Sequence, residues 1–516
     1  MRNPHRTSFS IALAATGLLV AGMAGSAAAF DLAELALHAQ QLSREPYIDP
    51  RGGVPSWLLE INYDQYRDIR FRPERALWRD RQLPFSVQFF HVGLYYDRAV
   101  AVNVVERSGA VKPVAFSPDQ FDYGANEFES RIPQDLGYAG FRIHYPIKRA
   151  GYQDEVAVFL GASYLRAVGR DHVYGLSARG VAIDTASSSG EEFPWFRAYW
   201  LVEPRPGAQE FTLYALLDSP SLTGAYRIVV APGPQTRIDV ELRLYPRVPI
   251  GKLGIAPLTS MFLHGEGSRG EIPRDYRPEV HDSDGLLIET KTGEWVWRPL
   301  ENPEKLSVTS SELVDPRGFG LMQRDRDFDH YQDIEARSDL RPGAFVVPKG
   351  EWGAGRVELV EIPTDEETND NIVVYWVSNT QASPEAPVSL AYSLFWTGDD
   401  RARPPGGRTV ATRQDAGTRD NATRFVVDFE GEALRRLPAD AVVEGVVSAN
   451  VGDPAEPGAM RPVEILEQQV IRNPATDGWR LVFQIEPPGD DPVELRAFLR
   501  HGQNTLSETW SSRLIP

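Results

Sequence analysis

Residues 238–244 read Ile-Asp-Val-Glu-Leu-Arg-Leu, a strict alternation of apolar and charged side chains. A period of two places every apolar residue on one face of a strand and every charged residue on the other. The preceding Ala-Pro-Gly-Pro at positions 231–234 is a turn signal, and Tyr226–Val230 before it is apolar enough to pair with the strand. This stretch therefore predicts a β-hairpin with one buried face.

Similar short β-type segments recur through the chain, separated by frequent glycine (43 residues) and proline (40 residues). This pattern predicts an all-β protein built from sandwiches. The polar, turn-rich stretch 397–407 cannot hold a central strand and is the best domain boundary. We expect a large β-sandwich over residues 30–398 and a smaller, immunoglobulin-like sandwich over residues 399–516. Further predicted strands cover Phe85–Tyr96, Phe211–Leu217, Glu294–Arg298, Arg356–Val360, Ile372–Trp376, Val388–Trp396, Arg424–Phe429, Ala441–Val447, Trp479–Gln484 and Val493–Leu499.

The N-terminal 29 residues have the pattern of a secretory signal peptide: arginines at positions 2 and 6, an apolar stretch, and a small-residue cleavage site before Phe30. The apolar stretch is shorter than the ~20 residues of a spanning helix, so we expect no stable membrane insertion. A helix should follow, with Asp31 as its N-cap and apolar residues at helical spacing from Leu32 to Leu42.

The formal net charge of −18 argues against nucleic acid as a partner. The absence of cysteine from the sequence excludes disulfides, thiolate metal sites and a cysteine nucleophile. The nine histidines are scattered without a zinc-binding spacing, so we expect no metal and no cofactor. A glycine pattern at 265–270 matches a dinucleotide fingerprint only formally, because Pro273 opposes the helix that must follow.

Two acidic segments are the strongest candidates for a functional site. Residues 364–371 read Thr-Asp-Glu-Glu-Thr-Asn-Asp-Asn and stand directly before an apolar strand, while residues 281–285 read His-Asp-Ser-Asp-Gly. Solvated loops explain such segments equally well. The functional interpretation is that crowded carboxylates can supply the acid and the base that cut a glycosidic bond.

Tryptophan side chains near these segments are candidate platforms for sugar rings, with core packing as the alternative. Trp352 and Trp376 are the residues we expect to line the wall of a substrate-binding groove, because both lie close to the acidic segment in sequence. The dense charge run at 324–333 is interpreted either as a solvent-facing loop or as a mobile loop over a polar substrate.

Long stretches of the sequence resemble the periplasmic glucan biosynthesis proteins of Gram-negative bacteria, the G protein and its D paralogue. The resemblance covers nearly all of the chain after residue 29. The matching stretches include Val173–Gly180, Ser189–Pro194, Leu216–Pro220, Ala256–Phe262, Trp297–Leu300, Lys349–Gly353, Glu367–Asn371 and Leu506–Trp510.

This resemblance implies a galactose-mutarotase-type sandwich followed by an immunoglobulin-like domain, and a periplasmic role in making osmoregulated glucans with a β-1,2-linked backbone. The family is also similar to inverting glycoside hydrolases of β-1,2-glucan, and by that similarity Asp370 is the general acid and Asp282 the base. The missing twin-arginine signal favours the G type, whereas Asp284 matches the D type. A hydrolase, a glucan-binding protein and a branching transglycosidase all remain open, as does the oligomeric state.

Overall fold

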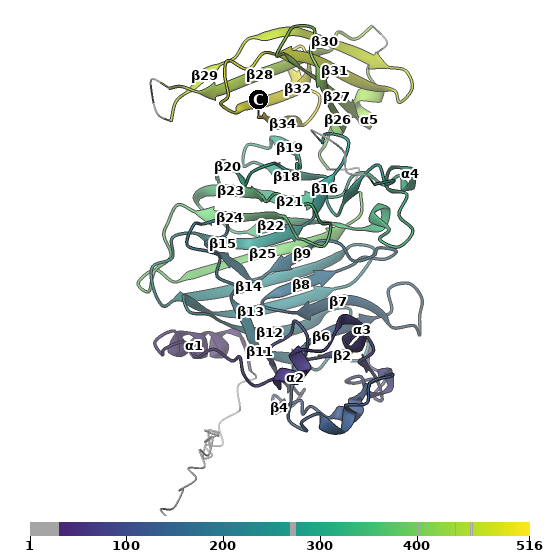
Figure 1. The fold of residues 1–516 in the computed structure, drawn as a ribbon, viewed down its shortest axis with the longest axis vertical. Helices are drawn as coiled ribbons and strands as arrows, with labels where there is room; N and C mark the ends of the chain where they lie inside the picture. The colour runs from purple at the N-terminus through teal and green to yellow at the C-terminus, as the bar shows by residue number, and fades with distance from the viewer. Residues whose placement is uncertain are drawn as a thin grey trace, which may run out of the picture.

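The computed structural model describes residues 30–268, 275–399, 403–438, 440–454, 456 and 458–515. The predicted signal peptide lies outside these residues. The described chain is almost entirely β-structure, which confirms the all-β prediction. Figure 1 shows the strands of the first 400 residues stacked through the middle of the molecule, with the C-terminal strands gathered at one end. Within the described residues, no helix is long and apolar enough to cross a membrane.

Two large antiparallel-rich sheets form the body of the fold. Within the described residues the first sheet has, in spatial order, β2 (Ser86–His91), β6 (Tyr138–Tyr145), β7 (Asp154–Leu160), β8 (Tyr164–Ala167), β9 (Ser177–Arg179), β15 (Leu253–Ser260), β24 (Ile372–Ser378), β23 (Ala354–Glu361) and β20 (Ser307–Val314), with β10 (Val181–Ile183) also paired to β15. The described part of the second sheet has β29 (Met460–Pro462), β28 (Glu444–Gly452), β32 (Val493–His501), β34 (Thr509–Leu514), β19 (Trp295–Pro299), β18 (Gly285–Glu289), β21 (Gly318–Met322), β22 (Gly343–Lys349), β25 (Val388–Thr397), β14 (Thr236–Pro246), β13 (Leu222–Ala231), β12 (Phe211–Asp218), β11 (Trp195–Val202), β3 (Ala101–Val105) and β4 (Val111–Pro113), with β33 (Asn504–Thr505) on β32.

Smaller elements complete the architecture. Another sheet contains β26 (Arg408–Ala416), β27 (Thr423–Glu430), β31 (Gly478–Ile485) and β30 (Ile465–Asn473), and two short pairs join β1 (Arg70–Phe71) to β5 (Phe121–Asp122) and β16 (Phe262–His264) to β17 (Val280–His281). The helices are α1 (Leu32–Leu42), α2 (Ser56–Leu59), α3 (Tyr63–Arg67), α4 (Phe328–Tyr331) and α5 (Glu432–Arg435), with 3-10 turns η1 (Pro73–Arg75), η2 (Pro118–Gln120), η3 (Glu129–Arg131) and η4 (Ser338–Leu340).

The predicted hairpin is confirmed. Strand β13 pairs antiparallel with β14 in register, and the side chains of β14 alternate between buried and partly or fully exposed along almost its whole length. Burial of the apolar face of β14 stabilises the fold by roughly 1.5–3 kcal/mol per fully buried branched side chain. The predicted N-terminal helix is also confirmed: the Asp31 carboxylate accepts hydrogen bonds from the backbone N–H groups of Ala33 and Glu34. Helix α1 then packs its apolar face against β12 and β13.

The main core lies between the two large sheets, which makes this part a sandwich. Phe141 and Phe159 of the first sheet stack on each other, and Tyr199 of the second sheet meets Phe141 edge-on with ring centroids 4.9 Å apart. A second core in the C-terminal part places Phe425 and Phe483 of one sheet against Trp510 of the other. The mutarotase and immunoglobulin types of these sandwiches stay predictions.

Contacts between the N-terminal and C-terminal parts of the chain are extensive. β19 pairs in parallel with β34, so Val296 lies opposite Thr509. The second core also includes Leu287 and Phe345, which belong to the first part of the chain. Strand β25 ends at Thr397 and β26 begins at Arg408. The division into two domains at residues 397–407 stays a proposal. Strands from before and after this boundary belong to one sheet.

Candidate active site

Asp282 and Asp370 come to the same end of the fold on the two sides of one short segment. The backbone N–H of Asp282 donates to the carbonyl of Met261 at 2.9 Å. The Asn371 side chain accepts from the N–H of Phe262 at 2.8 Å and donates to the Phe262 carbonyl at 3.0 Å. The two acidic segments therefore flank Met261–Phe262, although they are far apart in sequence. The predicted separation of the two carboxyl groups stays a prediction.

Asp282 is a buried carboxylate in contact with a cation. Its side chain forms an ion pair with the guanidinium of Arg341, and the residue is 8% exposed. Burial lowers the pKa of Arg341, the neighbouring charge of Arg166 lowers it further, and the carboxylate of Glu367 opposes both effects. The Arg341 Nε–H also donates to the Ala336 carbonyl at 3.2 Å, which fixes the direction of the side chain. Asp282 is thus presented as an anion held by a positively charged partner.

Asp370 lies on the exposed loop between β23 and β24. A general acid at this position calls for partial burial or for neighbouring carboxylates; Asp370 is exposed, and Asp365, Glu366 and Glu367 stand in the same loop. The loop is nonetheless fixed: the Thr364 carbonyl accepts from Asn302 Nδ2 at 2.7 Å, and the Thr364 N–H donates to Asn302 Oδ1 at 3.0 Å. Burial raises the pKa of Tyr164, the charge of Arg179 opposes this rise, and the charge of Asp370 adds to it.

A polar cavity of about 230 Å³ is lined by Met261 and Arg341, which both contact Asp282, and by Glu367 of the acidic loop. Its lining includes Arg277, Asp333, Arg341 and Glu367. The Arg277 guanidinium forms ion pairs with Asp333 at 2.9 Å and with Glu367 at 2.7 Å, and its hydrogen bonds to Asp275 lower the pKa of that carboxyl to about 2. Such a wall offers charged donors and acceptors to hydroxyl groups of a neutral ligand.

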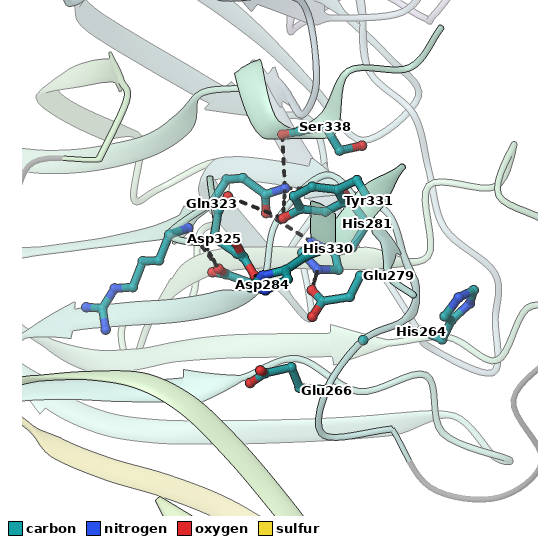
Figure 2. A network of polar contacts seen from close by, with 12 residues as sticks. His264, Glu266, Glu279, His281, Asp284, Gln323, Asp325, His330, Tyr331 and Ser338 are labelled. Atoms are coloured by element: carbon teal, nitrogen blue, oxygen red, sulfur yellow. Dashed lines mark hydrogen bonds and ion pairs between the residues drawn. The ribbon is translucent and has the colours of Figure 1, made fainter. Parts of the chain in front are cut away.

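A buried network lies beneath the strand that leads into Asp282, and Figure 2 shows its members from close by. The Gln323 amide nitrogen donates to the Tyr331 hydroxyl at 2.9 Å and to the Ser338 carbonyl at 3.2 Å. The Gln323 oxygen therefore accepts from His281 Nδ1–H at 3.0 Å, while His281 Nε2–H donates to the Glu279 carboxylate at 2.8 Å. Burial opposes the charged form, but the hydrogen bond to Glu279 holds the pKa of His281 above its ordinary value. His281 is therefore a buried imidazolium.

Comparisons of the sequence with known proteins identify its family. Residues 30–514 match the sequence profile described as periplasmic glucan biosynthesis protein, MdoG. The chain belongs to this family. A glucans biosynthesis protein G from Ralstonia nicotianae is 49% identical over 512 residues, which cover 97% of this chain and 99% of the relative. Proteins of the same name from Pseudomonas paraeruginosa and Pseudomonas aeruginosa PAO1 are 45% identical over 499 residues, covering 94% of this chain and 93% of each relative.

In this member of the MdoG family, the two tryptophans expected to line a groove are packed in the core. Trp376 is 0% exposed and Trp352 is 5% exposed. Their ring centroids lie 6.1 Å apart, and Trp352 meets Tyr392 edge-on at 6.1 Å. Because β24 is buried on both of its faces for most of its length, proximity in sequence to an exposed loop does not place Trp376 at the surface. Neither ring offers a face to a sugar.

The charge run at 324–333 differs from both interpretations of it. Arg324 is buried, with an 8% exposed side chain, and forms an ion pair with Glu508 at 2.6 Å. Tyr331, the last residue of helix α4, is 1% exposed. The exposed residues Asp327, Asp329, His330 and Gln332 fit the expectation of a solvent-facing loop. The run is therefore a fixed part of the wall behind the candidate site.

Several residues of the site gave no signal in the sequence. Arg277 and Arg341 are single arginines without a motif, and only the folded chain brings them beside Asp282 and Glu367. Gln323 is an isolated amide whose role depends on three long-range partners. Among the described residues, one group of side chains has the spacing of metal ligands, Glu279 with Asp325 and His330. The sequence analysis expects no metal, because the nine histidines show no zinc-binding spacing.

Glu361 is the last residue of β23, directly before the acidic loop, in this MdoG-family protein. We expect it to make the stability of the protein depend on pH. Burial raises its pKa to about 7, against the opposing charge of Arg298 and with support from Glu301. Because the folded pKa lies above the unfolded value, this contribution to the free energy of unfolding is complete below pH ~4.5 and is lost as the pH rises through about 7. The expected loss is about 3 kcal/mol.

Glu361→Gln removes the titrating group and keeps an acceptor for the Glu301 N–H, which donates to Glu361 at 2.9 Å. Chemical denaturation between pH 5 and 8 should show a flatter profile for this variant and greater stability than the parent above pH 7. Glu351→Gln, at an exposed position, is the matched control and should keep the parental profile. Identical profiles for the parent and Glu361→Gln would show that the carboxyl does not titrate in this range.

Proposed function

We propose that this protein is exported to the periplasm and acts there on the β-1,2-linked backbone of osmoregulated periplasmic glucans, by inverting glycoside hydrolysis. Membership of the MdoG family supports the glucan role, and the signal-like N-terminal residues support export. The observation that supports the hydrolytic part is that Asp282 hydrogen-bonds to Met261 and Asn371, the neighbour of Asp370, to Phe262, while Met261 lines a polar cavity.

In the proposed reaction, Asp370 donates a proton to the glycosidic oxygen while the bond between that oxygen and the anomeric carbon breaks. Asp282 accepts a proton from a water molecule, and the resulting hydroxide oxygen bonds to the anomeric carbon from the opposite face. The products are two shorter glucans, one with an inverted anomeric centre. Room for the water calls for carboxyl groups roughly 6.5–9.5 Å apart, or further if a chain of waters relays the proton.

The surroundings of the two carboxyls suit these different roles. The ion pair with Arg341 favours the anionic form of Asp282, which a base requires. Asp370 stands on an exposed loop, where a bound glucan would cover it and exclude water. Arg277, held by Asp333 and Glu367, places fixed donors beside the cavity for sugar hydroxyl groups.

The second candidate function is glucan binding without cleavage. The exposure of Asp370 in the free protein favours it, because an exposed carboxyl lacks the desolvation that usually keeps a general acid protonated. In this case both carboxylates would accept hydrogen bonds from sugar hydroxyls, and the protein would guide nascent polymer.

One experiment separates these functions: incubation of the purified mature protein with linear β-1,2-glucan, followed by size and linkage analysis of the products. Shortened chains with an inverted anomeric configuration support hydrolysis. Unchanged polymer with measurable affinity supports the binding function, and branched product supports a transglycosidase. If the protein neither cleaves this glucan nor binds it, the proposal is overturned.

A further inference from the structure

A second cavity, of about 70 Å³, lies on the other side of Glu279 from the cavity at Asp282, between the first part of the chain and β26. Glu266, Glu279, Asp284 and Asp325 all contribute to its lining. Figure 2 shows these acids and His330 around one space. Glu279 pairs with His281, Asp325 with His330 and Glu266 with Arg413, and carboxyl groups gathered around one small cavity favour a cation there. The proposed glucan reaction does not use this cluster.

Three side chains of the cluster have the spacing of a coordination shell. One ligand atom each from Glu279, Asp325 and His330 lie within 4.8 Å of one another. Metal–ligand bonds of about 2.0–2.2 Å place ligand atoms up to ~4.4 Å apart, so small rotations of these side chains close the site. The Glu279 N–H donates to the His330 carbonyl at 3.0 Å, which ties the two ligand-bearing segments together before any ion binds.

Hydrogen bonds from neighbouring residues orient the proposed ligands, as is usual in metal sites. Glu279 accepts a hydrogen bond from His281 Nε2–H at 2.8 Å. The backbone N–H of Asp325 donates to Asp284 Oδ2 at 2.9 Å, and the side chain of Asp325 accepts from the N–H of Asp327 at 3.0 Å. The other oxygen of Asp325 lies 2.5 Å from His330 Nδ1, so a bound ion would replace this contact between two of its own ligands.

An independent observation comes from Asp284. Its Oδ2 accepts two backbone N–H groups, from Arg324 and Asp325, but its other oxygen, Oδ1, is buried and has no hydrogen-bond partner within the described chain. A buried carboxylate oxygen without a donor costs about 1–3 kcal/mol or more. The guanidinium of Arg324, whose backbone N–H donates to Asp284, is already engaged with Glu508. Glu266, the fourth acid, is paired with Arg413 at 2.8 Å.

From these observations we propose that Glu279, Asp325 and His330 bind a divalent cation, with the carboxylates of Asp284 and Glu266 supplying further negative charge around it. Two carboxylates with one imidazole are a donor set for Zn²⁺ or Mn²⁺ rather than for Mg²⁺. The three ligands come from Glu279 just before β17 and from Asp325 and His330 at helix α4, and residues of β26 line the cavity beside them.

The test uses the mature chain without an affinity tag, treated with a chelator and then exchanged into metal-free buffer. Zn²⁺, Mn²⁺, Ca²⁺ and Mg²⁺ are titrated separately by calorimetry, and retained metal is counted by elemental analysis after dialysis. We expect one Zn²⁺ or Mn²⁺ per chain, and at least ~10-fold weaker binding of that ion in Asp325→Asn and in His330→Gln. Glu335→Gln, at an exposed acidic position nearby in sequence, should bind like the parent.

Circular dichroism and the metal-free melting temperature of each variant separate the loss of a ligand from the loss of the fold. Because the readout is bound metal, the result does not depend on any action on glucan. If the parent, Asp325→Asn and His330→Gln bind the ion equally well, the ion binds elsewhere on the surface and the proposal is overturned. Failure of the folded parent to retain either ion would overturn it as well.

Discussion

Asp282→Asn and Asp370→Asn are each expected to lower the rate of β-1,2-glucan cleavage at least ~10²-fold while glucan binding persists, because each removes one of the two proton transfers. The amide of asparagine keeps the size of the side chain but cannot give up or accept the reacting proton. At Asp370 the change is at an exposed position and should leave the fold intact. At Asp282 it leaves the buried guanidinium of Arg341 with a weaker partner, so the melting temperature must be measured beside the rate.

Asp365→Asn is the matched control, because it removes an exposed carboxylate from the same loop and takes no part in the proposed reaction. Product release from linear β-1,2-glucan gives the rates, and calorimetry with the same glucan gives the affinity. Full activity in both the Asp282 and the Asp370 variant would exclude these residues as the acid and the base. A selective loss of affinity would instead favour the glucan-binding function.

Arg324→Ala is expected to destabilise the protein by ~3–5 kcal/mol, because it leaves a buried carboxylate without its cationic partner. The guanidinium makes a two-pronged contact with Glu508, at 2.6 and 2.9 Å, and its central carbon lies 3.7 Å from the centroid of the Trp297 ring. The Glu508 side chain is 0% exposed and its other contact is the N–H of Thr409, at 2.7 Å. Removal of the cation leaves Glu508 charged in an apolar setting.

Denaturant unfolding monitored by tryptophan fluorescence measures this loss. The double variant Arg324→Met with Glu508→Gln should recover much of it, because no uncompensated charge remains. Arg436→Ala breaks an ion pair whose side chains are 76% and 65% exposed, and it should change the free energy of unfolding by less than ~1 kcal/mol. Equal effects of the Arg324 and Arg436 substitutions would show that burial does not strengthen the Arg324 contact.

The sequence predicted the elements whose pattern is local. Strand β14 alternates in polarity because one of its faces is buried, and helix α1 has a capping residue and an apolar stripe. Strand β15 escaped prediction, because all eight of its residues are buried and no alternation marks it. The pairing of β19 with β34 also escaped, since parallel pairing between segments so distant leaves no local signal.

The residues of the candidate site also differ in how far the sequence predicts them. The acidic residues form local segments that the sequence and its family resemblance both mark as candidates. Arg277 and Arg341 become part of the site only through tertiary contacts, which a single sequence does not display. Trp376 was assigned to a groove wall from its nearness to an exposed loop in sequence, whereas strand packing decides which way the ring faces.

The parallel pairing of β34 with β19 has a consequence for the order in which the protein becomes complete. During synthesis the chain emerges with its N-terminus first. Strand β19 therefore cannot pair with β34 until Thr509 has emerged, more than 200 residues after its partner Val296. Until that moment β19 presents an open sheet edge beside the candidate site, and open edges invite pairing with other chains. Loss of even the last few residues would therefore leave a nearly full-length polypeptide with an unfinished sheet and a tendency to aggregate.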